Sequence, residues 1–227
     1  MHERKFIMKK TISIILSLCM LLGICSFSVA AAPEGTAVSS AAEFAAMAAD
    51  GKYYLANDIT LDATYAGPFK GTLDGNGKTV TVSEPMFLEF CGTGMNLTIN
   101  GEVVADHAKD NGYWARGAFA CMASGDEMVT LYNITNNANV TVMGLGKHAG
   151  GFSARIVNNT TLGVPAECWF IDCVNNGNIY IDSTADEKMR AGGFSGILDL
   201  SHFYNCTNNG DVYMKGNICI GAGFIGR

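Results

Sequence analysis

The sequence predicts an all-β protein whose chain winds into a parallel β-helix, and two repeated features predict it. The first is a segment that recurs as LYNITNNANVTV, FIDCVNNGNIYI and FYNCTNNGDVYM, at residues 131–142, 170–181 and 203–214. The second is a signature of a small residue, glycine and phenylalanine after each copy, at residues 150–152, 192–194 and 222–224. Such repetition is typical of solenoids, in which each repeat contacts its neighbours. A β-sandwich is the competing fold, but it does not require matched residues at matched turns.

Residues 1–32 are predicted to be a secretory signal peptide. Four basic residues precede an apolar run over residues 11–29, and the run ends in small residues suited to cleavage. A transmembrane anchor is the alternative, because the run is near the lower length limit for spanning a membrane. After cleavage we expect a protein that is secreted or held at the cell surface, without insertion in the membrane.

Residues 33–51 are predicted to form a short leader and an N-terminal capping helix. Ser40 and Glu43 have the spacing of a capping box, in which side chains satisfy backbone N–H groups of the first turn. The Ala-rich segment that follows predicts a helix that ends near Gly51. With Phe44 on its apolar face, this helix is expected to cover the open end of a β structure and prevent edge-to-edge aggregation.

Residues 52–227 are predicted to form the β-helix repeat domain. Short segments of alternating apolar and polar residues are separated by Asn-Gly, Asn-Asn and Gly-rich turns, as in an all-β protein. Stacking of equivalent coils predicts a phenylalanine ladder and an asparagine ladder, the latter at a bend where asparagine tolerates a left-handed backbone. The expected ladder residues are Phe119, Phe152, Phe194 and Phe224, and Asn136, Asn175 and Asn208.

Six cysteines lie beyond the predicted signal peptide, namely Cys91, Cys121, Cys168, Cys173, Cys206 and Cys219. An even number in an exported protein is consistent with disulfides. The repeat favours free, buried thiols instead, because Cys173 and Cys206 occupy the place where Ile134 stands in the first copy. If their coils are neighbours, these two thiols still lie near disulfide distance.

The charge balance argues against two classes of partner. The chain carries 15 Lys and Arg against 21 Asp and Glu, a formal net charge of −6. Removal of residues 1–32 takes away four basic residues and one acidic residue, which leaves 11 against 20 and a net charge of −9. An acidic chain without a Lys/Arg cluster is not expected to bind nucleic acid or an anionic membrane surface.

The run AGGFSGILDLSHFYNCTNNGDVYM, residues 191–214, resembles the GLUG-type repeat of bacterial cell-surface proteins, and residues 43–82 resemble the module that precedes such repeats. In that repeat a Gly-Gly element leads to an aromatic-x-Asn-Cys segment and a Gly-x-Val strand; the first two repeats of this chain lack the Gly-Gly pair and the cysteine. The resemblance implies a right-handed parallel β-helix of pectin-lyase-like architecture in an exported, surface-associated protein, and it implies no activity. Because a solenoid is capped at its ends, the repeat signature beside Arg227 predicts that the repeat domain is C-terminally incomplete.

The sequence predicts no catalytic residue, no metal site and no cofactor. The segment TLDGNGKT places Thr72 where a P-loop needs its first glycine, and it continues into a strand instead of a helix. Asp74 and Asn76 offer oxygens to Ca²⁺ without the spacing of a Ca²⁺ loop, and His202 and Cys206 lack the further ligands of a zinc site. The acidic residues form no pair that predicts glycoside chemistry.

Tyr113 and Trp114 are the candidate binding residues. They lie in the polar insertion AKDNGYWARG, and aromatic side chains on a loop can stack on a sugar or anchor a protein partner. The alternative is that Trp114 is buried against the coil edge, and Trp169, at a strand start, is expected to be structural.

These features favour an exported, non-enzymatic module for adhesion, display or spacing, whose partner is a glycan or a host or cell-surface protein. A polysaccharide-binding or polysaccharide-active β-helix protein is the alternative. An acidic cluster or an aromatic row along one exposed sheet face would favour that alternative.

Overall fold

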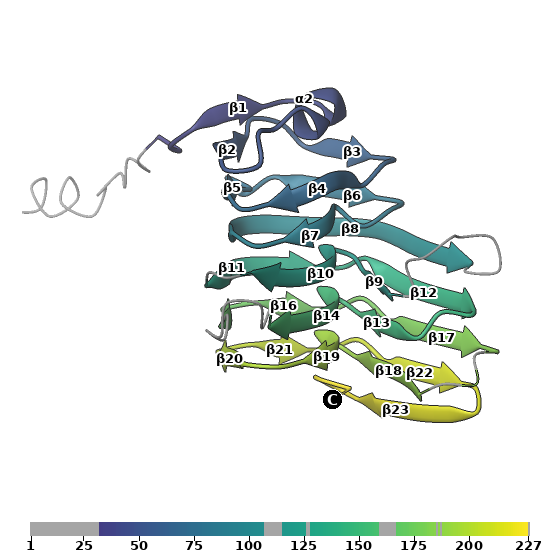
Figure 1. The fold of residues 1–227 in the computed structure, drawn as a ribbon. Helices are drawn as coiled ribbons and strands as arrows, with labels where there is room; N and C mark the ends of the chain where they lie inside the picture. Colours follow the sequence, from purple (N-terminus) through teal and green to yellow (C-terminus); the bar gives the residue numbers. More distant parts are fainter. Residues whose placement is uncertain are drawn as a thin grey trace, which may run out of the picture. The chain divides into compact units, whose positions relative to one another are not determined.

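The structure is a computed structural model that describes residues 32–106, 115–125, 128–158, 167–184, 186 and 188–226. Within these residues the fold is all-β with one short helix, and every pair of neighbouring strands runs parallel (Figure 1). Residues 1–31 of the predicted signal peptide lie outside the described residues.

The strands form three sheets. The 14-stranded sheet contains β1 (Thr36–Val38), β2 (Lys52–Leu55), β3 (Ile59–Leu61), β5 (Thr72–Asp74), β6 (Thr79–Val82), β8 (Thr93–Asp106), β11 (Val129–Asn136), β12 (Asn139–Gly144), β15 (Cys168–Ile171), β16 (Val174–Asn175), β17 (Ile179–Ser183), β20 (Ser201–Tyr204), β21 (Thr207–Asn208) and β22 (Val212–Lys215). The five-stranded sheet contains β4 (Tyr65–Phe69), β7 (Phe87–Phe90), β10 (Ala120–Gly125), β14 (Ser153–Asn158) and β19 (Ser195–Leu198). The four-stranded sheet contains β9 (Ala115–Gly117), β13 (His148–Gly150), β18 (Lys188–Gly192) and β23 (Ile218–Ala222).

The later turns, from β9 onward, contribute strands to the three sheets in the same order, whereas the turns through β4–β6 and β7–β8 contribute to the five-stranded and 14-stranded sheets (Figure 1). One turn runs through β13, β14 and β15–β17, and the next runs through β18, β19 and β20–β22. Equivalent strands pair in register, with Tyr132 opposite Ile171 and Ile171 opposite Tyr204. The asparagines Asn136, Asn175 and Asn208 repeat after 39 and then 33 residues, so turns of unequal length keep one register. Stacked parallel turns of this kind are compatible with a β-helix-like fold.

Phenylalanine rings fill the interior between the sheets. Phe152 and Phe194 stack with centroids 4.9 Å apart and planes 14° apart, and Phe194 and Phe224 stack at 4.8 Å and 9°. Phe119 is also buried, but it packs edge-on against Phe90 of the preceding turn, at 4.7 Å and 75°. The regular face-to-face stack therefore runs through the last three signatures, where the turns match most closely.

A ladder of asparagine amides crosses the interior beside these rings. Asn136 Nδ2 donates to Asn175 Oδ1, and Asn175 Nδ2 donates to Asn208 Oδ1, both at 2.7 Å. Asn136 and Asn175 are fully buried, so each amide satisfies its neighbour where water has no access. The left-handed backbone expected at this ladder occurs elsewhere, at Asn133 and its equivalents Asn96, Asp172 and Asn205, where φ is 51–53°. The ladder asparagines themselves end strands β11, β16 and β21, and there the backbone is extended.

The two repeated sequence features are coupled in space. A Cβ on Gly151 would collide with Asn175 Oδ1, and a Cβ on Gly193 would collide with the Asn208 amide. The middle glycines of the first two signatures therefore leave the room that the ladder amide of the same turn occupies. This contact explains why the glycine and the asparagine recur together.

The N-terminal helix α2 (Ala41–Ala45) is shorter than the sequence predicts. Ser40 Oγ accepts from the Glu43 N–H at 3.3 Å, as in a capping box, but Glu43 Oε2 accepts from the N–H of Ser39, the residue before the N-cap, at 2.6 Å. A helix of this length has little stability of its own, and the burial of Phe44 and Met47 decides where it lies and ends. The preceding leader forms strand β1, which pairs with β2.

Five cysteines are described, and all five are free thiols. Cys91, Cys168 and Cys173 are buried, Cys206 is half-buried, and Cys219 is exposed. The expectation of buried thiols is therefore wrong for Cys219. It stands opposite the buried Met189, at an inward position of β23, but it lines an open cavity beside β22 and is exposed. The side chain of Cys121 lies outside what the structure describes.

Candidate functional site

Exposed aromatic side chains gather on the outer surface of the 14-stranded sheet. Side chains alternate between the two faces of a strand, and in β15 the buried Phe170 separates Trp169 from Ile171 on the outer face. Tyr132 on β11 is 42% exposed, and Tyr204 on β20 is 70% exposed. Tyr132, Trp169, His202 and Tyr204 make up what is here named the aromatic face.

Trp169 and His202 form one row of the aromatic face. They pair across β15 and β20, and their rings stack with centroids 4.2 Å apart and planes 21° apart. Glu167 Oε2 accepts from Trp169 Nε1 at 3.2 Å and lies 3.6 Å from His202 Nε2. One carboxylate thus holds the Trp169 indole by a hydrogen bond, lies beside the His202 ring, and remains partly open to water, with 47% of its side chain exposed.

Tyr132 and Tyr204 form the second row. Both pair with Ile171, from opposite sides, so the two phenol rings lie two strand spacings apart with an apolar residue between them. Two spacings correspond to ~9.6 Å. This row therefore presents two exposed aromatic rings with the apolar side chain of Ile171 between them.

The same sheet continues into a second outward-facing set on β17 and β22. Tyr180 and Tyr213 stack with centroids 4.8 Å apart and planes 3° apart, next to an ion pair of 2.9 Å between Lys215 Nζ and Asp182 Oδ2. Between this tyrosine pair and the aromatic face runs an exposed amide ladder formed by Asn100, Asn137, Asn176 and Asn209. Each amide retains hydrogen-bonding capacity beyond its ladder bonds. Along the last two described turns, the outer surface of the sheet therefore offers polar amides between two sets of aromatic rings.

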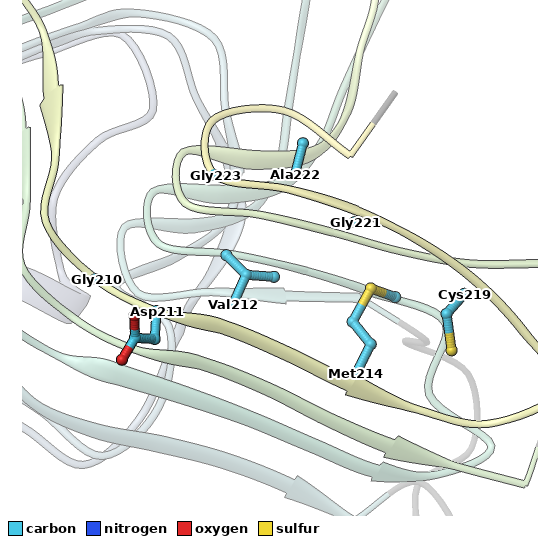
Figure 2. Close-up of a pocket in the computed structure, with 8 residues that line it drawn as sticks. All are labelled: Gly210, Asp211, Val212, Met214, Cys219, Gly221, Ala222 and Gly223. Carbon is cyan, nitrogen blue, oxygen red and sulfur yellow. The ribbon is translucent and has the colours of Figure 1, made fainter.

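A cavity of about 440 Å³ opens between β22 and β23 (Figure 2). Val212 and Met214 project into it, whereas their equivalents Ile179 and Ile181 in the preceding turn are fully buried. Its walls are otherwise small residues and glycines, and Asp211 brings the one charged side chain among the residues that line it. Ligand sites combine apolar walls with several converging polar groups. We therefore place the candidate site on the aromatic face and regard this cavity as an opening of the core.

The aromatic residues singled out in the sequence differ in where the structure places them. Tyr113 and Trp114 lie outside the described residues. Trp169, which was expected to be structural, is half-exposed and stacks on His202 at the surface. Sequence reasoning missed this face because its residues come from three separate turns, and the pairing of those turns brings them together. The repeated segments did contain one indication of this face, because Tyr132 and Tyr204 occupy equivalent places in the first and third copies.

The turn carboxylates have structural partners. Asp74 Oδ1 accepts from the Asn76 N–H at 2.8 Å and from Asn96 Nδ2 at 3.0 Å, and Asp58 Oδ1 accepts from the Thr79 N–H at 2.8 Å. In the described part of the chain, no three His, Cys, Asp or Glu side chains gather closely enough to hold a metal ion. The described residues also include no helix with the length and apolar character needed to cross a membrane.

Comparison of the chain with protein-family models, with curated proteins and with solved structures gave no match. The function is therefore argued from the geometry of the aromatic face.

Proposed function

We propose that this chain is an exported, surface-associated adhesion module that binds a glycan chain through its aromatic face, on a closed right-handed parallel β-helix of the GLUG type. The observation that carries the binding proposal is the double row of exposed aromatic rings on neighbouring strands. The stacked parallel turns and the recurring Gly-Phe and Asn-Asn features support the solenoid, and the apolar run over residues 11–29 supports export.

The chemistry of the aromatic face suits a sugar chain. A sugar ring presents apolar C–H groups on one face and hydroxyls around its edge, and exposed tyrosine and tryptophan rings offer flat apolar surfaces that carry a polar group. The Glu167 carboxylate, 47% exposed, accepts hydrogen bonds from hydroxyls beside Trp169. Tyr132 and Tyr204 lie ~9.6 Å apart, so a chain of linked sugars contacts both rings, whereas a single sugar contacts one. Affinity should therefore rise with chain length.

A glycan array tests this proposal. The purified chain is compared with Trp169→Ala and Tyr204→Ala, and Tyr213→Ala serves as a matched control because Tyr213 is also an exposed, stacked tyrosine on the last turn. We expect Trp169→Ala and Tyr204→Ala each to weaken binding at least about 10-fold, equivalent to about 1.4 kcal/mol, and Tyr213→Ala to change it less than about twofold, because a residue outside the contact contributes little.

The array also includes Tyr113→Ala/Trp114→Ala and immobilised host-matrix proteins. Loss of binding in that double variant alone would move the site to the insertion. Binding to a matrix protein without any glycan signal would replace the glycan by a protein partner. No binding by the unaltered chain would contradict the adhesion proposal.

A further inference from the structure

Cys173 and Cys206 occupy equivalent positions in adjacent turns. The flanking pairs, Ile171 with Tyr204 and Val174 with Thr207, are in register, and the Thr207 N–H donates to the Cys173 carbonyl at 3.0 Å. Paired parallel strands are ~4.8 Å apart, which lies within the Cα separation of about 4.4–6.8 Å that a disulfide requires.

The two thiols differ in access. Cys173 is completely buried, and its Sγ lies within hydrogen-bonding distance of the Leu131 and Ile171 carbonyl oxygens, at 3.4 and 3.3 Å. Cys206 is half-buried, and its Sγ lies within hydrogen-bonding distance of the Phe170 and Tyr204 carbonyl oxygens, at 3.3 and 3.4 Å. A reagent in solution therefore meets the Cys206 sulfur first, with the Cys173 sulfur behind it.

The pKa values of the two thiols also differ, because Cys173 is more deeply buried and the two thiols share a hydrogen bond. The hydrogen bond from Cys173 lowers the pKa of Cys206 to about 7. That hydrogen bond, together with burial, raises the pKa of Cys173 far above its usual value. The shift favours the thiolate of Cys206 over that of Cys173, and the thiolate is the nucleophile in disulfide exchange. The other described partners of cysteines in paired strands are not thiols: Cys168 lies opposite Ser201, and Cys219 lies opposite Met189.

We propose that Cys206 and Cys173 are a reactive dithiol that low-molecular-weight disulfides convert into an intramolecular Cys173–Cys206 disulfide. The Cys206 thiolate attacks one sulfur of R–S–S–R, which forms a Cys206–S–S–R bond and releases RS⁻. The Cys173 thiol passes its proton to the released thiolate, its sulfur attacks the Cys206 sulfur, and the second RS⁻ leaves. The two cysteines lose two electrons, and R–S–S–R is reduced to two R–SH after protonation.

The disulfide would join β15–β16 to β20–β21 in the two last turns of the sheet. Tyr204 lies two residues before Cys206, so oxidation would fix the outermost strand of the aromatic face. Reduction would leave that strand held by its backbone and ladder hydrogen bonds.

Peptide mapping of the full chain tests this proposal directly. The reduced chain is incubated at pH 7.5 with oxidised glutathione, quenched with acid and digested on the amino side of aspartate. This cleavage separates the thiols, because residues 172–181 contain Cys173 alone and residues 199–210 contain Cys206 alone. We expect these two fragments to become cross-linked, with the loss of both free forms. The variant Cys173→Ala should stop at a glutathione adduct on Cys206, and Cys206→Ala should leave the Cys173 thiol unmodified.

Cys219→Ala is the matched control, since it removes the exposed thiol and should leave the cross-link unchanged. The proposal is overturned if Cys219 becomes fully modified while Cys173 and Cys206 stay reduced. It is equally overturned if the Cys206 adduct accumulates in the unaltered chain without resolving. The measurement on the unaltered chain decides the matter even if a variant fails to fold.

Discussion

Replacing one buried amide of the asparagine ladder tests what holds the turns together. Asn175 makes three side-chain hydrogen bonds: Nδ2 donates to Asn208 Oδ1 at 2.7 Å and to the Gly177 carbonyl at 2.9 Å, and Oδ1 accepts from Asn136 Nδ2 at 2.7 Å. Asn175→Ala removes all three bonds and leaves the Gly177 carbonyl and Asn208 Oδ1 without these donors. The side chain is fully buried, so water does not replace what is lost.

The magnitude follows from the number of bonds. Each hydrogen bond contributes about 1 kcal/mol net, and a buried group left without its partner costs about 1–3 kcal/mol. We therefore expect Asn175→Ala to lower the free energy of unfolding by about 3 kcal/mol. Measured by circular dichroism in urea, with a slope of about 3 kcal/mol per molar, this lowers the midpoint by about 1 M.

Asn176→Ala is the matched control, because Asn176 is the next residue and makes two ladder bonds of 2.8 Å, with Asn137 and Asn209. Its side chain is exposed, so water takes the place of the lost amide and the expected cost is below about 0.5 kcal/mol. Equal costs for the two variants, or a cost below about 0.5 kcal/mol for Asn175→Ala, would refute the reasoning that burial gives this ladder its strength.

Three further predictions concern stability. Gly193→Ala should cost about 1–3 kcal/mol, because its Cβ would collide with the Asn208 amide; Gly223→Ala, at the equivalent place with no atom within 4 Å, should cost much less in the same urea titration. Phe194→Ala, in the middle of the ring stack, should cost about 3–5 kcal/mol in thermal unfolding, and a change below about 1 kcal/mol would contradict the packing described. Burial and the nearby Arg190 lower the pKa of His148 from 6.5 to about 4, so the unfolded chain binds more protons and stability should fall as pH drops from about 6.5 to about 4; a His148→Phe variant should lose this dependence.

Much of the fold could be predicted from the sequence, because stacked turns require matched residues. The recurrence of Asn136, Asn175 and Asn208 predicted a ladder, and the structure places these amides in hydrogen-bonded succession. The helix length was wrong because alanine-rich composition measures intrinsic propensity, whereas packing of Phe44 decides where the helix ends. The position of the left-handed residues was wrong because asparagine serves both as a ladder amide and as a turn residue, and sequence alone does not separate the two roles.

The candidate site was less predictable, because it depends on which turns become neighbours. Trp169 and His202 are 33 residues apart, and their stacking follows from the pairing of β15 with β20. The sequence indicated that an aromatic row would favour glycan binding. It did not show whether an aromatic residue at a strand start, such as Trp169, faces outward or inward. Tyr113 and Trp114 remain predictions, because they lie outside the described residues.

Tryptophan fluorescence tests the role of the aromatic face most directly. The chain has two tryptophans, so in a Trp114→Phe variant the emission comes from Trp169 alone. Titration with an oligosaccharide selected on the array should produce a saturable change in this emission, and in Trp114→Phe/Tyr204→Ala the midpoint of the change should move to a concentration at least about 10-fold higher. Binding of the oligosaccharide with no change in Trp169 emission would contradict the central claim that the aromatic face binds the glycan.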